Sequence, residues 1–383
     1  MNIFIRTIVV FNLWILFANP VLSTSWMRRK PYVQNVTTTK LSILWETGSR
    51  EKCKIILEAV DADDQWEKVS PRGIIHEVRF TGLAPYTKYR YKVFTSRKVY
   101  SEIVRTAPDK DTHFSFLIMG DNRNGHSNHQ TVINAMAMEP ASFYINTGDL
   151  TNDGLKRENW YRFLEIEYPL MKRIPLYAVV GNHENCFGKG EDLFMRYFAH
   201  PQNSPYPELV YTFSWGNSRF FVLNSEKPFV GGSQSAWLKS QLQQTVMDKD
   251  ILHIFVIVHI SPFTSGPHGP NEELLESGLV EVMHKYGVDM LFAGHDHLYE
   301  RGRVRNLNYV VTAGGGAPIY YVKEPKPYSL VTEPTLHYTK MIVKGNILEF
   351  SAHRTDGSLI DFFTIKKTIK KNRQPIFKIL KEG

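Results

Sequence analysis

The sequence predicts an α/β protein in which a small all-β sandwich precedes a larger domain with mostly parallel sheets flanked by helices. Two patterns predict it. Hydrophobic and polar residues alternate in 27–107, as in half-buried strands, whereas 113–365 contains continuous apolar runs followed by polar loops and helices. The chain has 383 residues, of which 43% are hydrophobic and 22% charged. This length favours two domains, and this composition excludes a disordered, collagenous or coiled-coil protein.

The first segment consists of short strands separated by turn residues. In residues 88–93 the pattern places two tyrosines and a valine on one face and three cations on the other. Residues 53–58 alternate in the same way, and a further run, LSILW, ends at Trp45. Nothing in this segment indicates catalysis, so we expect a spacer or docking module, separated from the next domain by the polar link 107–112.

Five apolar runs in the larger domain are expected to form its central strands. They are FSFLIM (114–119), SFYIN (142–146), LYAVV (176–180), ILHIFVIV (251–258) and MLFA (290–293). Amphipathic helices are expected around 130–138, 158–172, 235–246 and 272–286. Apolar strands joined by helices indicate a largely parallel sheet that is covered on both faces.

Each of these strands is followed by Asp, Asn or His. The residues are Asp121, Asp149, Asn182, His259, His295 and His297. Because the carboxyl ends of strands in open α/β sheets meet where ligands bind, we expect these side chains to converge. Mixed oxygen and nitrogen donors suit Zn, Mn or Fe better than Ca or Mg, and six ligands are natural for two ions that share a carboxylate. Glycines precede four of the six and allow tight turns.

The same segments resemble the signature of calcineurin-like metallophosphoesterases. The matching motifs are Gly120-Asp121, Gly148-Asp149, Gly181-Asn182-His183-Glu184, His259 and Gly294-His295-Asp296-His297. The run from Gly294 to Arg301 is similar to the G-H-x-H-x-Y-E-R of purple acid phosphatases, and LAPYTKYRYKV (83–93) is similar to fibronectin type III domains. The resemblance implies an α+β sandwich of the metallophosphoesterase type over 113–365, behind a fibronectin type III-like sandwich over 27–107.

The resemblance also implies a role for each ligand of two divalent ions. Asp149 would bridge the ions, with Asp121 and His297 on the first. The remaining three residues, Asn182, His259 and His295, would hold the second.

The catalytic residues that the resemblance implies are His183 and His268. His183 would contact the phosphate, with Glu184 behind it, and His268 would lie beside the leaving group. An ordinary loop histidine is the other interpretation of His268, because its segment is rich in Pro and Gly. The reaction expected is in-line attack on phosphorus by a hydroxide that bridges the two ions, while His268 or His183 protonates the departing alkoxide.

Two positions depart from the family pattern. Asn152 stands where purple acid phosphatases have the tyrosine that binds ferric iron, and Arg123 stands where many other relatives have a histidine. Either Asn152 or water could complete the first ion's ligands. Arg123 could bind the substrate phosphate through its planar fork or form a salt bridge at a helix start. We therefore expect a colourless protein with two divalent ions (Fe, Mn or Zn) rather than a ferric–divalent pair.

The expected function is that of a metal-dependent phosphoric ester hydrolase, similar to an acid phosphatase, acting on a small-molecule phosphate ester. Phosphodiesters and nucleotides are alternative substrates, because the same ligand set serves them. Phe187, Trp215 and Phe229 are candidates to stack on an aromatic leaving group or to pack in the core. The second class of function is a catalytically weak binding or adhesion protein that retains the metal site.

The N-terminus predicts export. Arg6 precedes an apolar run at 7–18, and Val21-Leu22-Ser23 offers a cleavage site. We expect residues 1–23 to be a signal peptide and the protein to be secreted or periplasmic; an uncleaved anchor is the alternative. No other stretch of the sequence is long and apolar enough to cross a membrane.

The positive charge of the chain is concentrated at its C-terminal end. The formal net charge is +8, and residues 366–383 contain seven Lys or Arg against one acid. We expect a solvated basic tail there, with contact to an anionic surface as the alternative. The rest of the chain is close to neutral, so a broad nucleic-acid-binding face is not expected. Cys53 and Cys186 are expected to be unpaired thiols, with a disulfide as the alternative in an exported protein.

Overall fold

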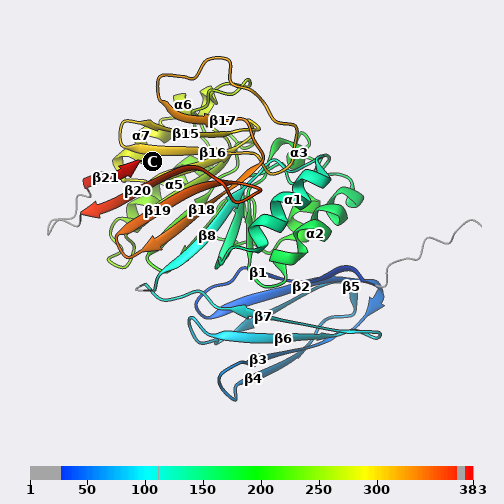
Figure 1. Ribbon diagram of the computed structural model, residues 1–383. Helices are drawn as coiled ribbons and strands as arrows, with labels where there is room; N and C mark the ends of the chain where they lie inside the picture. The colour runs from blue at the N-terminus through cyan, green and yellow to red at the C-terminus, as the bar shows by residue number, and fades with distance from the viewer. Residues whose placement is uncertain (1–26, 111, 369–375, 383) are drawn as a thin grey trace, which may run out of the picture.

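The computed structural model describes residues 27–110, 112–368 and 376–382, so the predicted signal peptide lies outside the described residues. The chain begins with an all-β sandwich of two antiparallel sheets (Figure 1). One sheet has the order β1-β2-β5, from Met27–Gln34, Lys40–Glu51 and Gly73–Thr81. The other has the order β4-β3-β6-β7, from Gln65–Val69, Lys54–Ala59, Lys88–Phe94 and Val99–Arg105. The predicted all-β N-terminal region is confirmed, and Tyr89, Tyr91 and Val93 face its core as the alternation predicts.

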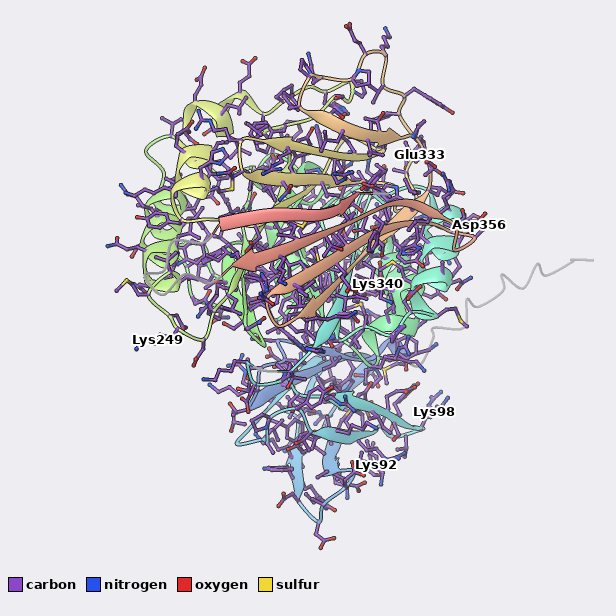
Figure 2. The ribbon with its side chains drawn as sticks, turned by 60° about the vertical axis from the view of Figure 1, so that its left-hand side comes forward. Lys92, Lys98, Lys249, Glu333, Lys340 and Asp356 are labelled. Atoms are coloured by element: carbon purple, nitrogen blue, oxygen red, sulfur yellow. The ribbon has the colours of Figure 1, made fainter. Side chains whose placement is uncertain are left out.

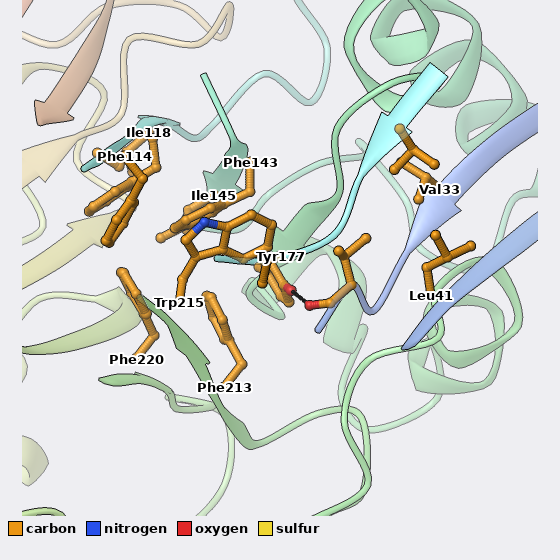
Figure 3. Close-up of a cluster of buried hydrophobic side chains, with 14 of the residues drawn as sticks. Val33, Leu41, Phe114, Ile118, Phe143, Ile145, Tyr177, Phe213, Trp215 and Phe220 are labelled. Atoms are coloured by element: carbon orange, nitrogen blue, oxygen red, sulfur yellow. Dashed lines mark hydrogen bonds between the residues drawn. The ribbon is translucent and has the colours of Figure 1, made fainter. Parts of the chain in front are cut away.

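The sandwich packs against the larger domain through tyrosine hydroxyls. Tyr91 donates to the carbonyl of Lys172 at 2.8 Å, and Tyr32 donates to the carbonyl of Tyr197 at 2.7 Å. From the other side, the hydroxyl of Tyr177 donates to the carbonyl of Val36 at 3.0 Å (Figure 3). Because these phenols lie in apolar surroundings, each needs such a partner, and together the bonds orient the two domains.

The first large sheet has seven strands in the order β10-β9-β8-β18-β19-β20-β21. Strands β8 (Phe114–Met119), β9 (Phe143–Asn146) and β10 (Leu176–Ala178) are parallel and correspond to three predicted strands. The other four pair antiparallel: β18 (His337–Lys344), β19 (Ile347–Arg354), β20 (Leu359–Thr368) and β21 (Ile376–Glu382).

The second large sheet also has seven strands, in the order β11-β12-β13-β14-β16-β15-β17. Its parallel centre is formed by β12 (Ser218–Val222), β13 (His253–Ile260), β14 (Met290–Gly294) and β16 (Leu307–Thr312). Antiparallel strands lie at its edges: β11 (Tyr211–Trp215), β15 (Tyr299–Val304) and β17 (Ser329–Glu333). Strands joined by a predicted helix are therefore parallel, and β14 and β16 are parallel as well although β15 connects them.

Helices cover the outer face of each sheet (Figure 1). The first sheet is covered by α1 (His126–Ala137) and α2 (Arg157–Met171), and the short helices α3 (Asn182–Asn185) and α4 (Glu191–Tyr197) follow β10. The second sheet is covered by α5 (Ser233–Thr245), α6 (Glu272–Glu276) and α7 (Leu279–Lys285). The single helix predicted over 272–286 is divided in two because Gly278 adopts a left-handed φ of 73°, which ends the first helical segment.

The inner faces of the two sheets pack against each other through aromatic side chains (Figure 3). Phe143 of β9 lies at the centre, with its ring 5.0 Å from that of Phe116 and 4.8 Å from that of Trp215. Phe220 of β12 lies 5.3 Å from Phe143 in an edge-to-face arrangement. This core fixes the relation between the strands that carry the polar loops.

The segment predicted as a basic tail contributes strands to the first sheet. Strand β20 extends to Thr368, and β21 pairs with it antiparallel over Ile376–Glu382. The reason is that β21 satisfies backbone groups along the open edge of β20, which a solvated tail would leave unpaired. Lys367 is buried, and its ammonium contacts Asp289 at 2.6 Å.

The surface of the described residues carries both signs of charge. Figure 2 shows Lys92 and Lys98 on the sandwich, and Lys340, Glu333 and Asp356 on the larger domain. Cys53 and Cys186 are both free thiols, Cys53 buried in the sandwich and Cys186 partly exposed. Among the described residues, no helix is both long and apolar enough to cross a bilayer.

Acid will destabilise the fold through His200. This imidazole is buried, its Nε2 accepts a hydrogen bond from the backbone of Ala178 at 3.2 Å, and burial lowers its pKa to about 3. In the unfolded chain the group titrates near about 6.5, so the unfolded state binds the extra proton as the pH falls below that value. Stability from His200 is complete above about pH 6.5, and about 2 kcal/mol is lost by about pH 5.

Urea unfolding of the protein and of a His200→Gln variant at pH 7.5 and pH 5.0 measures this contribution. Buried His253 and His337 act in the same direction, since burial lowers the pKa of each to about 4. The comparison with the variant separates His200 from them. We expect the variant's deficit in unfolding free energy to shrink by about 2 kcal/mol at the lower pH, whereas an equal deficit at both would refute the assignment.

Candidate metal centre

The loops that follow five strands of the two large sheets bring the six predicted ligands together. Asp121 follows β8, Asp149 follows β9, and Asn182 begins α3 after β10; His259 lies near the end of β13, and His295 and His297 follow β14. Three of these residues adopt left-handed φ angles: 60° at Asp121, 54° at Asp149 and 72° at His295. Such angles are uncommon outside glycine and occur where a site demands a particular side-chain direction.

The glycines that precede the ligands are needed mainly for close approach. A Cβ on Gly181 would collide with the Asp149 carboxylate, and one on Gly294 would collide with the Asp121 carboxylate. Gly148 has in addition a φ of 111°, which L-residues rarely adopt.

Asp121, Asp149 and His297 form the first group of donors. All three are buried, and one ligand atom from each lies within 4.8 Å of the other two. The backbone N–H of His295 donates to both carboxylate oxygens of Asp121 at 3.0 Å. Burial, and then the charge of Asp149, raises the pKa of Asp121 well above its usual range. A cation among these atoms would offset that cost.

Asn182, His259 and His295 form the second group, beside Asp149. His259 Nε2 lies 3.1 Å from Asn182 Oδ1 and 3.4 Å from Asp149 Oδ1. The ring of His295 lies 5.2 Å from that of His259. Burial, with the neighbouring imidazoles His259, His268 and His297, lowers the pKa of His295 to about 2, so it is neutral. Asp149 contacts both groups, which is the arrangement of a shared carboxylate.

The orientation of two histidines fits metal coordination. His259 Nδ1 lies 2.9 Å from the carbonyl of Thr147, and His297 Nδ1 lies 2.7 Å from that of Pro318. A carbonyl can only accept, so each Nδ1 carries the proton, and a neutral ring then turns the lone pair of Nε2 inward. For His297, burial lowers the pKa to about 4, which keeps the ring neutral. Its Nε2 faces Asp121 Oδ1 at 3.6 Å, and facing acceptors of this kind are stabilised by a metal cation between them.

His183 lies at the open side of the site. Its Nδ1 donates to the carbonyl of Asn152 at 2.8 Å, and its Nε2 lies 3.9 Å from Asp149 Oδ2. Behind it, Glu184 is fully buried and accepts from the backbone N–H groups of Thr151 at 2.8 Å and Gly181 at 3.1 Å. Burial, and then the charge of Asp149, raises the pKa of Glu184 to about 8. Glu184 thus joins the loop of Asp149 to the start of α3.

Arg123 is in the site, and the side chain of Asn152 faces outward. Arg123 Nε lies 3.5 Å from Asp149 Oδ2, is buried and has no hydrogen-bond acceptor among the described residues. Asn152 is an exposed residue that contributes its backbone carbonyl to His183. A seventh protein ligand from Asn152 therefore stays a prediction.

Residues 111–299 match the Calcineurin-like phosphoesterase family. The chain contains a calcineurin-like phosphoesterase domain. Its curated relatives include Purple acid phosphatase 23 of Arabidopsis thaliana, 28% identical over 65% of this chain and 61% of the relative. They also include a phosphoenolpyruvate phosphatase of Allium cepa, 27% identical over 64% of this chain and 54% of the relative. The chain thus spans little more than half the length of these relatives.

Two solved structures have the same fold as this chain. Purple acid phosphatase PPD1 from yellow lupin (Lupinus luteus) seeds superposes with a TM-score of 0.76 at 17% identity, over 88% of this chain and 74% of the lupin chain. The structure of PhoD superposes with a TM-score of 0.69 at 11% identity, over 91% of each chain. Both sequence identities are low, so these likenesses establish the fold alone.

Two residues near the six predicted ligands could not be selected from the sequence. The Tyr320 ring stacks on that of His297 at 4.2 Å, and Asp296 Oδ1 lies 2.8 Å from Nδ1 of His268. Tyr320 comes from a loop that carries no motif. Asp296 lies within the Gly294–His297 motif, but the sequence does not indicate that it contacts His268, 28 residues earlier. His268 itself is near the ligands, with its ring 4.2 Å from that of His295.

Two of the three candidate stacking aromatics lie in the core. Trp215 and Phe229 are 2% and 1% exposed, because Trp215 packs against Phe143 of the first sheet and Phe229 belongs to the hydrophobic cluster on the second sheet. Phe187 is 100% exposed and has a left-handed φ of 57° on the turn after α3.

Proposed function

We propose that the chain is an exported hydrolase of phosphate monoesters that uses two divalent ions, Fe, Mn or Zn. The observation that carries the proposal is the convergence of six buried or half-buried donors from five strands, with Asp149 common to both groups. Mixed oxygen and imidazole donors of this kind suit those metals. The predicted signal peptide, residues 1–23, supports export.

Asp121, Asp149 and His297 would hold the first ion, and Asp149, Asn182, His259 and His295 the second. Bound ions would neutralise phosphate oxygens and lower the pKa of water to give a nucleophile near neutral pH. The chain's own groups bind and orient the ester. Arg123, whose buried Nε lacks a hydrogen-bond acceptor among the described residues, would bind a phosphate oxygen beside Asp149.

The two histidines outside the ligand set, His183 and His268, would bind a phosphate oxygen and protonate the leaving oxygen, respectively. The carbonyl of Asn152 holds Nδ1 of His183, which directs Nε2 toward the ligand atoms of Asp149 and so toward a bound phosphate. His268, beside His295 on the opposite side, would give its proton to the leaving oxygen. We infer a preference for monoesters from the relatives named as phosphatases, and diesters and nucleotides are the competing substrates.

Hydrolysis by the chelated and reloaded protein tests the proposal. The protein is stripped with chelator, reloaded separately with Mn, Zn or Fe(II), and assayed with 4-nitrophenyl phosphate and bis(4-nitrophenyl) phosphate. We expect negligible turnover without metal, restored turnover with at least one metal, and a higher kcat/KM for the monoester. Binding of two ions without turnover of either ester would refute the hydrolase and favour a binding protein that retains the site.

A further inference from the structure

We propose that Asp296 is a positioning residue that fixes His268 for proton donation to the leaving group. The inference rests on the proposed function and assigns a role within it to Asp296. In the sequence this residue lies between two proposed metal ligands, His295 and His297. Asp296 is only 2% exposed, and it is not part of the donor group formed by Asp121, Asp149 and His297. The hydrogen bonds of its carboxylate all come from the loop that carries His268.

Three donors from residues 264–268 converge on the Asp296 carboxylate. Oδ1 accepts from the backbone N–H of His268 at 3.2 Å and from its Nδ1 at 2.8 Å. Oδ2 accepts from the hydroxyl of Thr264 at 2.8 Å. A Cβ on Gly266 would collide with this carboxylate, so the loop is folded tightly around it. Burial makes these charge-assisted bonds strong, and they determine both the path of the loop and the rotation of the imidazole.

A second buried carboxylate anchors the same loop. Glu300 accepts from the backbone N–H of Ser265 at 2.7 Å and from its hydroxyl at 2.9 Å. It also accepts from the hydroxyl of Tyr309 at 2.7 Å, which ties it to β16. The run from His295, just after β14, to Glu300 in β15 therefore supplies two proposed ligand histidines to the metal centre and two carboxylates to the His268 loop. These bonds fix the position of the His268 loop relative to the metal centre.

The orientation of the His268 ring leaves one nitrogen for chemistry. Nδ1 is held by Asp296, and Nε2 has no hydrogen-bond partner among the described residues. The ring packs beside His295 at 4.2 Å and Tyr320 at 5.3 Å, and the side chain is 41% exposed. It is therefore both close to the centre and open to a substrate.

The proton transfer balances within the proposed reaction. Hydroxide derived from water forms the new bond to phosphorus, and the bond from phosphorus to the leaving oxygen breaks. The leaving oxygen takes the proton from Nε2 of His268. The ring thereby passes from imidazolium to neutral imidazole, while its Nδ1–H remains hydrogen-bonded to Asp296. Asp296 exchanges no proton with the substrate; it ensures that Nε2 is the nitrogen that faces the leaving oxygen.

Esters with good and poor leaving groups distinguish this role from a purely structural one. 4-Nitrophenolate departs as an anion and needs little help, whereas an alkoxide must be protonated. The experiment measures kcat/KM for 4-nitrophenyl phosphate and for an alkyl phosphate, glycerol 2-phosphate, with the metal-loaded protein and four variants. The variants are Asp296→Ala, Asp296→Asn, His268→Ala and the control His353→Ala, whose imidazole contacts Ser351 on β19.

We expect His268→Ala to lower alkyl ester turnover by about 10²-fold or more while sparing the nitrophenyl ester by comparison. Asp296→Ala should reproduce most of that selective loss, and adding it to His268→Ala should cost little further, because both changes remove one unit. Asp296→Asn keeps an acceptor for Nδ1–H and should restore most of the alkyl ester activity. His353→Ala should behave as the unchanged protein.

Three results would overturn the inference. An unchanged ratio of the two activities in Asp296→Ala would show that His268 needs no positioning. Equal loss on both esters with lost metal would show that Asp296 serves the metal centre or the fold. If the loaded, unchanged protein hydrolyses neither ester, the proposed function fails and the inference fails with it, a result distinct from the first two.

Discussion

Asp149→Asn is expected to abolish metal-dependent ester hydrolysis while leaving the fold intact. Oδ1 of Asp149 lies 3.4 Å from His259 Nε2 and accepts from the backbone N–H of His183 at 3.1 Å, and Oδ2 lies 3.5 Å from Arg123 Nε. No other side chain of the described residues contacts both donor groups in this way. Removing its charge weakens both proposed ion positions at once.

The expected loss in kcat/KM is at least about 10³-fold, because metal-ion activation supplies several kcal/mol of transition-state stabilisation. Metal content should fall by at least one ion per chain, measured by elemental analysis after gel filtration. Asp153→Asn is the matched control, since this carboxylate on the same loop pairs with Lys156 and caps Leu155 without touching the ligands. If Asp149→Asn keeps the activity and metal content of Asp153→Asn, the bridging role is disproved.

Phe143→Ala is expected to lower the free energy of unfolding by about 3–5 kcal/mol. Phe143 is fully buried between the two large sheets, where its ring lies within 6 Å of those of Phe116, Tyr177 and Phe213 (Figure 3). Both sheets contribute to this contact, so the surroundings cannot collapse on a smaller side chain without moving a sheet. The cavity term therefore adds to the lost burial.

Urea unfolding followed by tryptophan fluorescence measures this loss. Phe187→Ala is the control, because Phe187 is 100% exposed and its truncation should change the unfolding free energy by less than about 0.5 kcal/mol. A loss below about 1 kcal/mol for Phe143 would contradict the packing between the sheets.

The ligand set was predictable because each residue directly follows an apolar strand. The run FSFLIM indicates β8, and the geometry of α/β sheets then places Asp121 at the same edge as Asp149 and His259. The convergence of these side chains followed from this topology, whereas their distances depend on the loops, where Asp121, Asp149 and His295 adopt left-handed φ angles. The hydrogen bonds that orient the histidines, such as His297 to the carbonyl of Pro318, carry no sequence signal, because any residue supplies a carbonyl.

The antiparallel half of each large sheet was not predicted. Strand β18 begins at His337 and pairs with β8, which lies more than 200 residues earlier in the chain, and β19 and β20 extend the sheet from β18. The alternation of residues in β18 indicates a strand, but only tertiary structure shows which edge it joins. The same limit applies to Tyr320 and to the partner of Asp296, because their roles depend on the path of a loop between distant strands.

Crystals of the protein grown with Mn or Zn, measured at the absorption edge of the metal, test the metal centre most directly. We expect two anomalous peaks, one beside Asp121 and His297 and one beside Asn182, His259 and His295, both in contact with Asp149. A single peak would limit the centre to one ion, and no peak at these residues in crystals that bind the metal elsewhere would contradict the metal centre itself.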